Sequence, residues 1–324
     1  DEDIRLMKLA GCNLMSVGIF AWAALEPDEG RYDFDWLETV LNRLHAANIR
    51  VLLATPSGAR PAWMSQRYPE VLRVRSDGGR NFHGNRHNHC FTSPVYRDFV
   101  RRINTALAER FGHHPAVVGW HISNEYGGEC HCPLCQEAFR SFLKARYGTL
   151  DRLNRAWWTS FWAKTYTDWA QLHSPSAMGE QSVHGLTLNW KRFVTHQTLD
   201  FLHTESEPIR RIAPDLPITI NLMSNGDWNV YEGLDYFRFG DAIDFSSYDS
   251  YPQWGAKDQE AVAIHAAFTY DLTRCVGGGK PWALMESTPS QTNWQPVCKL
   301  KKPGMHLLSS LQAVAHGADT VQYF

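Results

Sequence analysis

The sequence lacks an excess of charge of either sign and has no long hydrophobic run. Its 324 residues include 32 lysines and arginines against 34 aspartates and glutamates, and no basic run exceeds a few residues. A surface for nucleic acid or for an anionic membrane is therefore not indicated. No stretch approaches the roughly 18 to 20 apolar residues needed to cross a bilayer, and no signal-peptide pattern opens the chain. We expect a neutral partner, with neither nucleic acid nor membrane.

The sequence also lacks a glycine-rich phosphate loop, an internal repeat, a low-complexity segment and a linker that marks a second domain. Without the phosphate loop, an open doubly wound sheet has no nucleotide to bind. The length suits one (β/α)₈ TIM barrel, which typically has about 250 residues and tolerates insertions. We therefore predict one catalytic TIM-barrel domain over residues 1–324.

Strand-like apolar runs alternate with helical patterns along the chain, which indicates a parallel sheet covered by helices. The predicted strands are 13–19, 49–54, one that opens at Val117, 217–222, 242–246, 281–286 and 320–324. The predicted helices are 3–11, 35–47, 94–111, 133–147, 188–212, 258–275 and 303–316. Seven strands are one fewer than a closed barrel needs. We expect that the first strand is missing and that Phe324 ends the eighth.

One predicted loop, residues 55–93, is much longer than the others. Long structureless loops inside a compact domain are usually functional. In a barrel this loop would leave the carboxyl ends of the strands, which is the face where barrel active sites are built.

Two buried strands end in a glutamate. The strand that opens at Val117 runs through Trp120 and Ile122 to Asn124 and Glu125, and the strand 281–286 ends in Glu286. A single acid at a strand end is more often a cap for the following helix. A second one, 161 residues later, favours a catalytic role for both. Two carboxyl groups at the same rim of a barrel are typical of the active site of a glycosidase.

Glycosidic cleavage with retention needs one carboxylic acid and one carboxylate about 5 to 5.5 Å apart. Two carboxyls this close cannot both ionise cheaply, so one pKa rises until that group is an acid near neutrality. The residues alone do not assign the roles of Glu125 and Glu286. Asn124 can present its amide to a sugar hydroxyl, or equally bond to backbone. The 13% aromatic content also supplies flat faces on which sugar rings stack, although most such rings are core.

Four cysteines are predicted to hold a metal. Cys130, Cys132 and Cys135 form Cys-x-Cys-x-x-Cys just after Glu125, and Cys90 ends the long loop. Four thiolates make a closed tetrahedral zinc site, which is structural rather than catalytic, and which here would join two rim loops. The alternatives are buried or disulfide-bonded thiols, and a fourth ligand drawn from the nearby histidines His87, His89 and His131.

The other cysteines, Cys12, Cys275 and Cys298, have no partner by spacing and are expected to be core or surface thiols. Unpaired thiols together with a thiolate metal site favour a reducing compartment, so we expect a cytoplasmic protein.

Weaker candidates surround the two glutamates. Arg86 lies four residues before Cys90, so a loop held by zinc at Cys90 would direct the Arg86 guanidinium into the site. The alternative is an arginine on the surface. Trp162 and Trp294 could floor a sugar subsite or be core residues. The run 248–252 follows the sixth strand and is a candidate pocket lining, whereas Glu26 is more readily a loop anchor.

At these residues the sequence resembles a known family. The segments Gly18-Ile19-Phe20-Ala21-Trp22, Leu25-Glu26-Pro27, Trp120-His121-Ile122-Ser123-Asn124-Glu125-Tyr126-Gly127 and Cys130-His131-Cys132 are similar to those of glycoside hydrolase family 42 β-galactosidases. The resemblance covers nearly the whole chain. Its motifs are specific in combination.

The resemblance implies that Glu125 is the acid/base and Glu286 the nucleophile. It implies that Arg86, Asn124, Trp162 and Trp294 contact the sugar, and that Cys90, Cys130, Cys132 and Cys135 hold zinc. Members are commonly bacterial, intracellular and homotrimeric, with a trimerisation domain and a small β domain after the barrel. We expect this chain to lack those later domains, the first strand, and a Glu and a His that members place beyond the eighth strand.

The predicted function is that of a retaining exo-β-galactosidase acting on terminal non-reducing β-D-galactosyl residues of lactose or galacto-oligosaccharides. One alternative is a related retaining glycosidase acting on β-glucosides, β-mannosides or α-L-arabinosides. Another is a non-catalytic carbohydrate-binding barrel, because a fold does not guarantee activity. A zinc-ribbon module for nucleic acid would need a basic face and a small domain, which the charge balance and length contradict.

Overall fold

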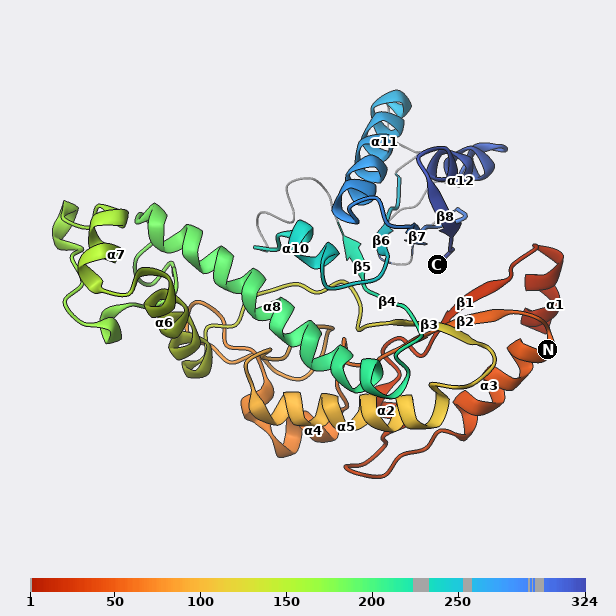
Figure 1. Ribbon diagram of the computed structural model, residues 1–324, viewed down its shortest axis with the longest axis horizontal. Coiled ribbons are helices and arrows are strands. Elements are labelled where there is room, and N and C mark those ends of the chain that lie inside the picture. Colours follow the sequence, from red (N-terminus) through yellow and green to blue (C-terminus); the bar gives the residue numbers. More distant parts are fainter. Residues whose placement is uncertain (1, 224–232, 253–257, 291, 293, 295–299) are drawn as a thin grey trace.

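The strands form one parallel series with helices around it (Figure 1). The computed structural model describes residues 2–223, 233–252, 258–290, 292, 294 and 300–324, so Cys298 lies outside the described residues. The strands are β1 Leu14–Val17, β2 Arg50–Ala54, β3 Val117–His121, β4 Ile218–Thr219, β5 Asn221–Met223, β6 Ser246–Asp249, β7 Trp282–Glu286 and β8 Ala318–Val321.

The helices follow the strands in alternation. They are α1 Glu2–Leu9, α2 Trp22–Leu25, α3 Asp35–Ala46, α4 Ala62–Arg67, α5 Pro94–Phe111, α6 Pro133–Tyr147, α7 Leu150–Trp157, α8 His184–Ile212, α10 Tyr236–Gly240, α11 Gln259–Val276 and α12 Met305–Ala315, with short 3₁₀ turns η1 Pro69–Val71, η2 Phe161–Ala163 and η3 Trp169–Gln171. None of these helices is long and apolar enough to span a bilayer, within the residues searched.

The strand order is β1-β2-β3-β4 in one sheet and β5-β6-β7-β8 in the other, with every pairing parallel. Only Ile220 separates β4 from β5, so residues 218–223 act as a single strand that pairs with β3 at one end and with β6 at the other. This gives seven strand positions in one continuous series. The chain therefore has a (β/α)₈ TIM-barrel fold with one position unfilled among the described residues.

The unfilled position lies between β8 and β1. No ladder joins these two strands in the described part of the chain, but the Ser16 hydroxyl, on β1, donates a hydrogen bond of 2.9 Å to the side-chain oxygen of Gln322, just after β8. The two edges of the series thus approach each other, as a nearly closed barrel requires.

Local sequence explains the elements that position the site. Helix α5 begins at Pro94, and the hydroxyl of Ser93 accepts from the amide of Tyr96, which caps the helix. Strand β3 is apolar and buried, and Gly119 within it faces β4 so closely that a Cβ there would lie 3.0 Å from the carbonyl oxygen of Pro217. Only glycine lets these backbones approach.

Figure 1 shows α6 and α7 at the far end of α8, away from the strands, whereas α5 lies alongside the other half of α8. The predicted helices 94–111 and 133–147 match α5 and α6 residue for residue, and α8 begins four residues before its predicted start. The loop 55–93 was expected to be structureless, but it contains α4 and η1.

Two strand predictions were misplaced. The expected strand 242–246 is wrong except for its last residue, because β6 spans Ser246–Asp249, and β8 begins two residues before its predicted start. Strand β6 consists of Ser-Ser-Tyr-Asp and is buried throughout. Both serine hydroxyls have partners: that of Ser246 donates to the Thr273 carbonyl oxygen on α11 at 3.0 Å, and that of Ser247 bonds to the Ile220 carbonyl oxygen at 3.0 Å and to the Thr219 hydroxyl at 3.0 Å. A buried strand here is polar rather than apolar.

Candidate active site

Glu125 lies four residues beyond the end of β3, on a sharply turned backbone. Both Ser123 and Glu125 have positive φ angles, 52° and 40°. Such a conformation costs a non-glycine residue about 1 to 3 kcal/mol and persists only where surrounding contacts hold it. The amide of Ser123 donates to the Thr55 hydroxyl at 2.7 Å, and that of Glu125 donates to the side-chain oxygen of Asn221 at 2.9 Å. The neighbouring strands therefore fix the direction of the Glu125 side chain.

Glu286 meets Glu125 at the carboxyl ends of the strands. Carboxylate oxygens of Glu125, Asp249 and Glu286 all lie within 4.8 Å of one another, although the residues come from the ends of β3, β6 and β7. Glu125 and Asp249 are 4% and 5% exposed, so the carboxyls face each other away from bulk water. For Glu125 and Glu286, oxygens within 4.8 Å of each other agree with the roughly 5 Å of retaining glycosidases better than with the 6.5 to 9.5 Å of inverting ones.

One side-chain amide, that of Asn221, contacts all three acidic residues: two through their carboxylates and Glu125 through its backbone amide. The side-chain nitrogen of Asn221 lies 2.5 Å from Asp249 Oδ2, 3.1 Å from Glu286 Oε1 and 2.9 Å from Asn124 Oδ1. Its oxygen accepts from the Glu125 backbone and lies 2.9 Å from a ring nitrogen of His121. Asn221 is 1% exposed and sits at the centre of the site.

The electrostatics of the site follow from burial and crowding. Burial, and then the charge of Glu125, raise the pKa of Glu286 to about 7, and the Tyr251 hydroxyl donates to the Glu286 carboxylate. Burial, followed by Glu286 and Glu125, raises the pKa of Asp249 well above its usual value. Arg86 forms an ion pair with Glu125 and places a positive charge beside the carboxyls. Carboxyls coupled in this way titrate as a set, so the site holds at least one proton near neutral pH.

The structure places most of the predicted sugar-contact residues around this set. Asn124 donates its amide to Glu125 Oε2 at 3.2 Å and is bonded to side chains rather than to backbone. Arg86 is 44% exposed at the side chain yet pairs with buried Glu125. Trp294 is half exposed and lies edge-on to Tyr251, with ring centroids 4.8 Å apart.

Trp162 lies apart from the carboxyls, in η2 beyond α7. Its side chain is 75% exposed, stacks on Phe161 and lies beneath the ammonium group of Lys164. The core alternative for this residue is therefore wrong, while contact with a sugar stays a prediction. Glu26 is a loop anchor, because its carboxylate accepts from the Trp22 indole at 2.7 Å and from the amide of Gly30 at 2.8 Å.

The four predicted cysteines also come together. The sulfurs of Cys90, Cys130, Cys132 and Cys135 all lie within 4.8 Å of one another, and all four residues are buried. Two of the separations are 3.4 Å and 3.6 Å. A tetrahedral zinc ion bonded at about 2.3 Å to each sulfur would separate the sulfurs by about 3.8 Å, so the donor set fits this metal. Cys90 and not a histidine takes the fourth place in the cluster.

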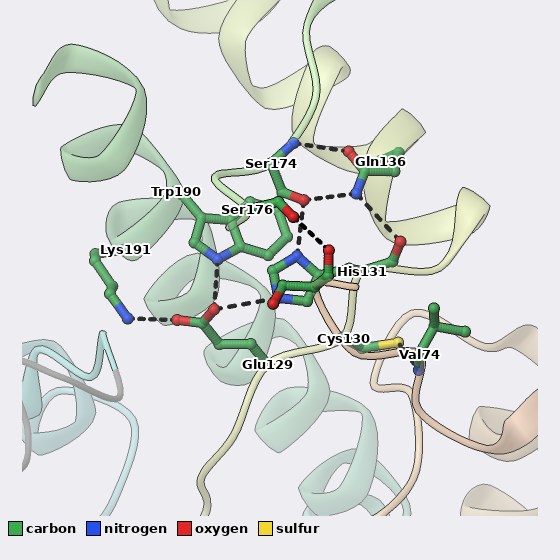
Figure 2. Close-up of polar contacts among 10 residues, drawn as sticks. Val74, Glu129, Cys130, His131, Gln136, Ser174, Ser176, Trp190 and Lys191 are labelled. Atoms are coloured by element: carbon green, nitrogen blue, oxygen red, sulfur yellow. Dashed lines mark hydrogen bonds and ion pairs between the residues drawn. The ribbon is translucent and has the colours of Figure 1, made fainter. Parts of the chain in front are cut away.

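A polar network fixes the chain between Glu125 and the cysteines (Figure 2). Glu129 accepts from the Trp190 indole at 2.8 Å and pairs with Lys191, both on α8. His131 bonds to the Ser174 hydroxyl at 2.7 Å and lies 3.4 Å from Glu129. Burial alone would raise the pKa of Glu129, but hydrogen bonds from His131, Lys191 and Trp190 outweigh it and lower this pKa to about 2. The loop that carries Cys130 is thereby tied to α8.

Three residues that lie in or against the group of carboxyls were missed or only partly found from the sequence. Asp249 and Tyr251 fall in the run 248–252, which was predicted as pocket lining without an assigned role. Asn221 was not singled out. The available signal was its place as the single amide in a mostly apolar predicted strand, since a buried polar group needs partners.

A parallel β/α barrel with paired carboxylates at the carboxyl ends of its strands defines a class of protein, the barrel glycosidases. Comparison with known proteins gives the particular family. The family model for glycoside hydrolase family 42, described as Beta-galactosidase, matches residues 1–324, and the chain belongs to this family.

Several characterised relatives are similar over the whole chain. Beta-galactosidase BglY of Alicyclobacillus acidocaldarius is 60% identical over all of this chain and 46% of its own length. Beta-galactosidase GanA of Bacillus subtilis is 55% identical over all of this chain and 48% of its own length. The crystal structure of the beta-galactosidase from Rahnella sp. R3 has a TM-score of 0.96 and 60% identity, covering 99% of this chain and 47% of that one. The chain spans about half the length of these relatives.

Proposed function

We propose that the protein carrying this chain is a retaining exo-β-galactosidase that hydrolyses terminal non-reducing β-D-galactosyl residues of lactose or galacto-oligosaccharides. The observation that carries the proposal is the approach of Glu125 and Glu286 to within 4.8 Å, in a chain that belongs to a β-galactosidase family. That spacing leaves no room for a water between the second carboxylate and the sugar, which inversion would need.

The proposed reaction has two displacements. Glu286 attacks the anomeric carbon while Glu125 gives its proton to the departing glycosidic oxygen, so the C1–O bond breaks and an ester to Glu286 forms. Glu125, now a carboxylate, takes a proton from water as that water attacks C1 and releases Glu286. The raised pKa of Glu286 supports one proton and one charge being present together in the coupled carboxyls near neutral pH, whereas the assignment of acid and nucleophile follows the family pattern.

The sugar-binding roles follow from position. Asn124 has its oxygen held by Asn221 and its amide nitrogen beside Glu125, so this amide can donate to a sugar hydroxyl next to the reacting carbon, and such a bond would strengthen as charge develops. Arg86 would exchange part of its contact with Glu125 for the sugar. Trp294 offers an apolar face beside Tyr251 for stacking. Trp162 is assigned to the sugar by family resemblance alone.

The cysteine cluster is proposed to hold a structural zinc ion. Cys90, Cys130, Cys132 and Cys135 would occupy all four positions, which leaves none for water or substrate. When bound, zinc joins the loop that carries Arg86 to the loop that follows Glu125. We further propose a homotrimer for the whole protein and a cytoplasmic location, where thiolates stay reduced.

Two substitutions test the assignment of roles. Glu286→Ala should abolish hydrolysis of 4-nitrophenyl β-galactoside by the whole protein. Glu125→Ala should be slow, yet regain turnover with added azide, because an activated leaving group needs no acid and azide replaces the water that needs a base. Full activity of either variant without azide would contradict the proposal. Rates on matched glucoside, mannoside and arabinoside substrates decide the sugar, and equal or faster turnover of one of them would displace galactose.

A further inference from the structure

Asp249 is the third carboxyl of the site, and the proposed reaction gives it no task. It ends β6, is 5% exposed, and receives the Asn221 amide on Oδ2 at 2.5 Å. Within the part of the chain that the structure describes, no donor reaches its other oxygen, Oδ1. A carboxylate oxygen of Asp249 and one of Glu125 lie within 4.8 Å of each other, and this neighbour contributes to the raised pKa of Asp249. Two carboxyl oxygens can share a hydrogen bond only if one of them carries a proton.

We infer that Asp249 is a positioning residue, which stays protonated during the proposed reaction, anchors Asn221 through Oδ2 and donates its own proton in a hydrogen bond to Glu125. This inference rests on the proposed function. An ionised Asp249 would add a second buried negative charge beside Glu286, which is costly, whereas the neutral acid form can accept from Asn221 and donate to Glu125. Burial and the two neighbouring carboxyls also raise its pKa well above the usual range.

The charge of the whole site agrees with a neutral Asp249. Among the described residues, the titratable groups near Asp249 are Glu125, Glu286, Tyr236 and Tyr251, and the guanidinium of Arg86 lies beside Glu125. In the resting state the nucleophile must be ionised and the acid protonated. With Asp249 also protonated, one carboxylate balances one guanidinium, and a buried site of zero net charge is favoured over one with excess charge.

The inferred role runs through Asn221. That side chain contacts the oxygen of Asn124, the carboxylate of Glu286 and the backbone amide of Glu125. An amide without an anchor would lose its orientation and, with it, the geometry of the reacting groups, where small misplacements reduce rate strongly. Asp249 has no role as proton donor to the sugar in this scheme.

The test compares two variants of the whole protein. Asp249→Asn presents an oxygen to Asn221 and an N–H to Glu125, as the protonated acid does. Asp249→Ala removes both contacts. We expect Asp249→Ala to lower kcat about 100-fold with little change in KM, the size seen when one preorganised donor is removed. Asp249→Asn should recover kcat to within about tenfold of the wild type and keep both limbs of the pH–rate profile. An Asp249→Asn variant as slow as the alanine variant, or one that loses a limb, would show that the ionised form is needed.

A double substitution tests whether Asp249 acts through Asn221. If it does, adding Asp249→Ala to Asn221→Ala should cost much less than the 100-fold expected for Asp249→Ala alone, whereas multiplying losses would overturn the positioning role. Thermal unfolding checks that each variant folds, and Asp249→Asn decides the matter if the alanine variant does not.

A readout independent of activity separates this inference from the proposed function. The infrared spectrum of the wild type at neutral pH should contain a protonated-carboxyl C=O band that the Asp249→Asn variant lacks. Absence of that band refutes the inference. If the band is present but the wild type does not hydrolyse galactosides, the proposed function fails and the protonated Asp249 stands.

Discussion

Replacing Glu205 by glutamine should make the protein more stable above neutral pH. Glu205 lies on α8 and is fully buried among aromatic rings, where its Oε2 accepts from the hydroxyl of Tyr126, the residue after Glu125. Burial raises the pKa of Glu205 to about 7 from an ordinary value of 4.5. A glutamine side chain keeps an oxygen for Tyr126 but cannot ionise, so it removes the cost of a buried charge.

The magnitude follows from linkage. A group whose pKa is higher in the folded state contributes stability that is fully present below 4.5 and is lost as the pH rises through about 7. At about 1.4 kcal/mol per pKa unit, the whole loss is about 3 kcal/mol. Most of it, about 2 kcal/mol, falls between pH 5 and pH 8.

The assay is denaturant or thermal unfolding of the whole protein near pH 5 and near pH 8. Glu207→Gln is the matched control, because Glu207 lies on the same helix with its side chain 58% exposed beside Arg211. The difference in stability between Glu205→Gln and wild type should grow in favour of the variant as pH rises, and the control should not show this trend. A difference that stays constant or shrinks would refute the reasoning.

Two other perturbations test the cysteine cluster and its support. The wild type should contain one zinc ion per chain, and the Cys135→Ser variant should lose that zinc and unfold at a lower temperature. Replacing the exposed Cys275 by serine should leave the zinc content and the unfolding temperature unchanged. Wild-type protein free of zinc would contradict the metal assignment. Glu129→Gln should destabilise the protein by about 2 kcal/mol at neutral pH, because it weakens the contacts to His131 and Lys191. Because the pKa of Glu129 is lowered to about 2 in the folded protein, its contribution to stability is present above pH 4.5 and is lost as the pH falls toward 2. The free energies of unfolding of variant and wild type should therefore converge in acid. A difference between them that does not change with pH would refute this role.

The fold was largely predictable because apolar residues repeat at regular spacing along most of its helices and strands. Helices α5 and α6 begin at prolines that follow a loop, and their apolar faces repeat at helical spacing, so both of their ends were found. Strand β6 was misplaced because Ala242, Ile243 and Phe245 make residues 242–245 look more like a strand than Ser246–Asp249 does. Hydroxyls of adjacent strands satisfy one another there, and that compensation exists only after the strands are side by side.

The candidate site was predictable where chemistry repeats in the sequence. Glu125 and Glu286 each end an apolar strand, and the cysteine spacing is tight, so both groups could be named. Asn221 could not be assigned a role, because its importance lies in contacts to residues 28 to 97 positions away. The positive φ angles of Ser123 and Glu125 were likewise out of reach, since neither residue type favours that conformation and long-range hydrogen bonds impose it.

The stereochemistry of the first product tests the central claim most directly. If Glu125 and Glu286 act on one anomeric carbon from within 4.8 Å of each other, each displacement inverts C1 and the two together retain it. Proton NMR of a 4-nitrophenyl β-galactoside digest, recorded before mutarotation, should show β-galactose as the first sugar released. Initial release of α-galactose would contradict the paired-carboxylate account.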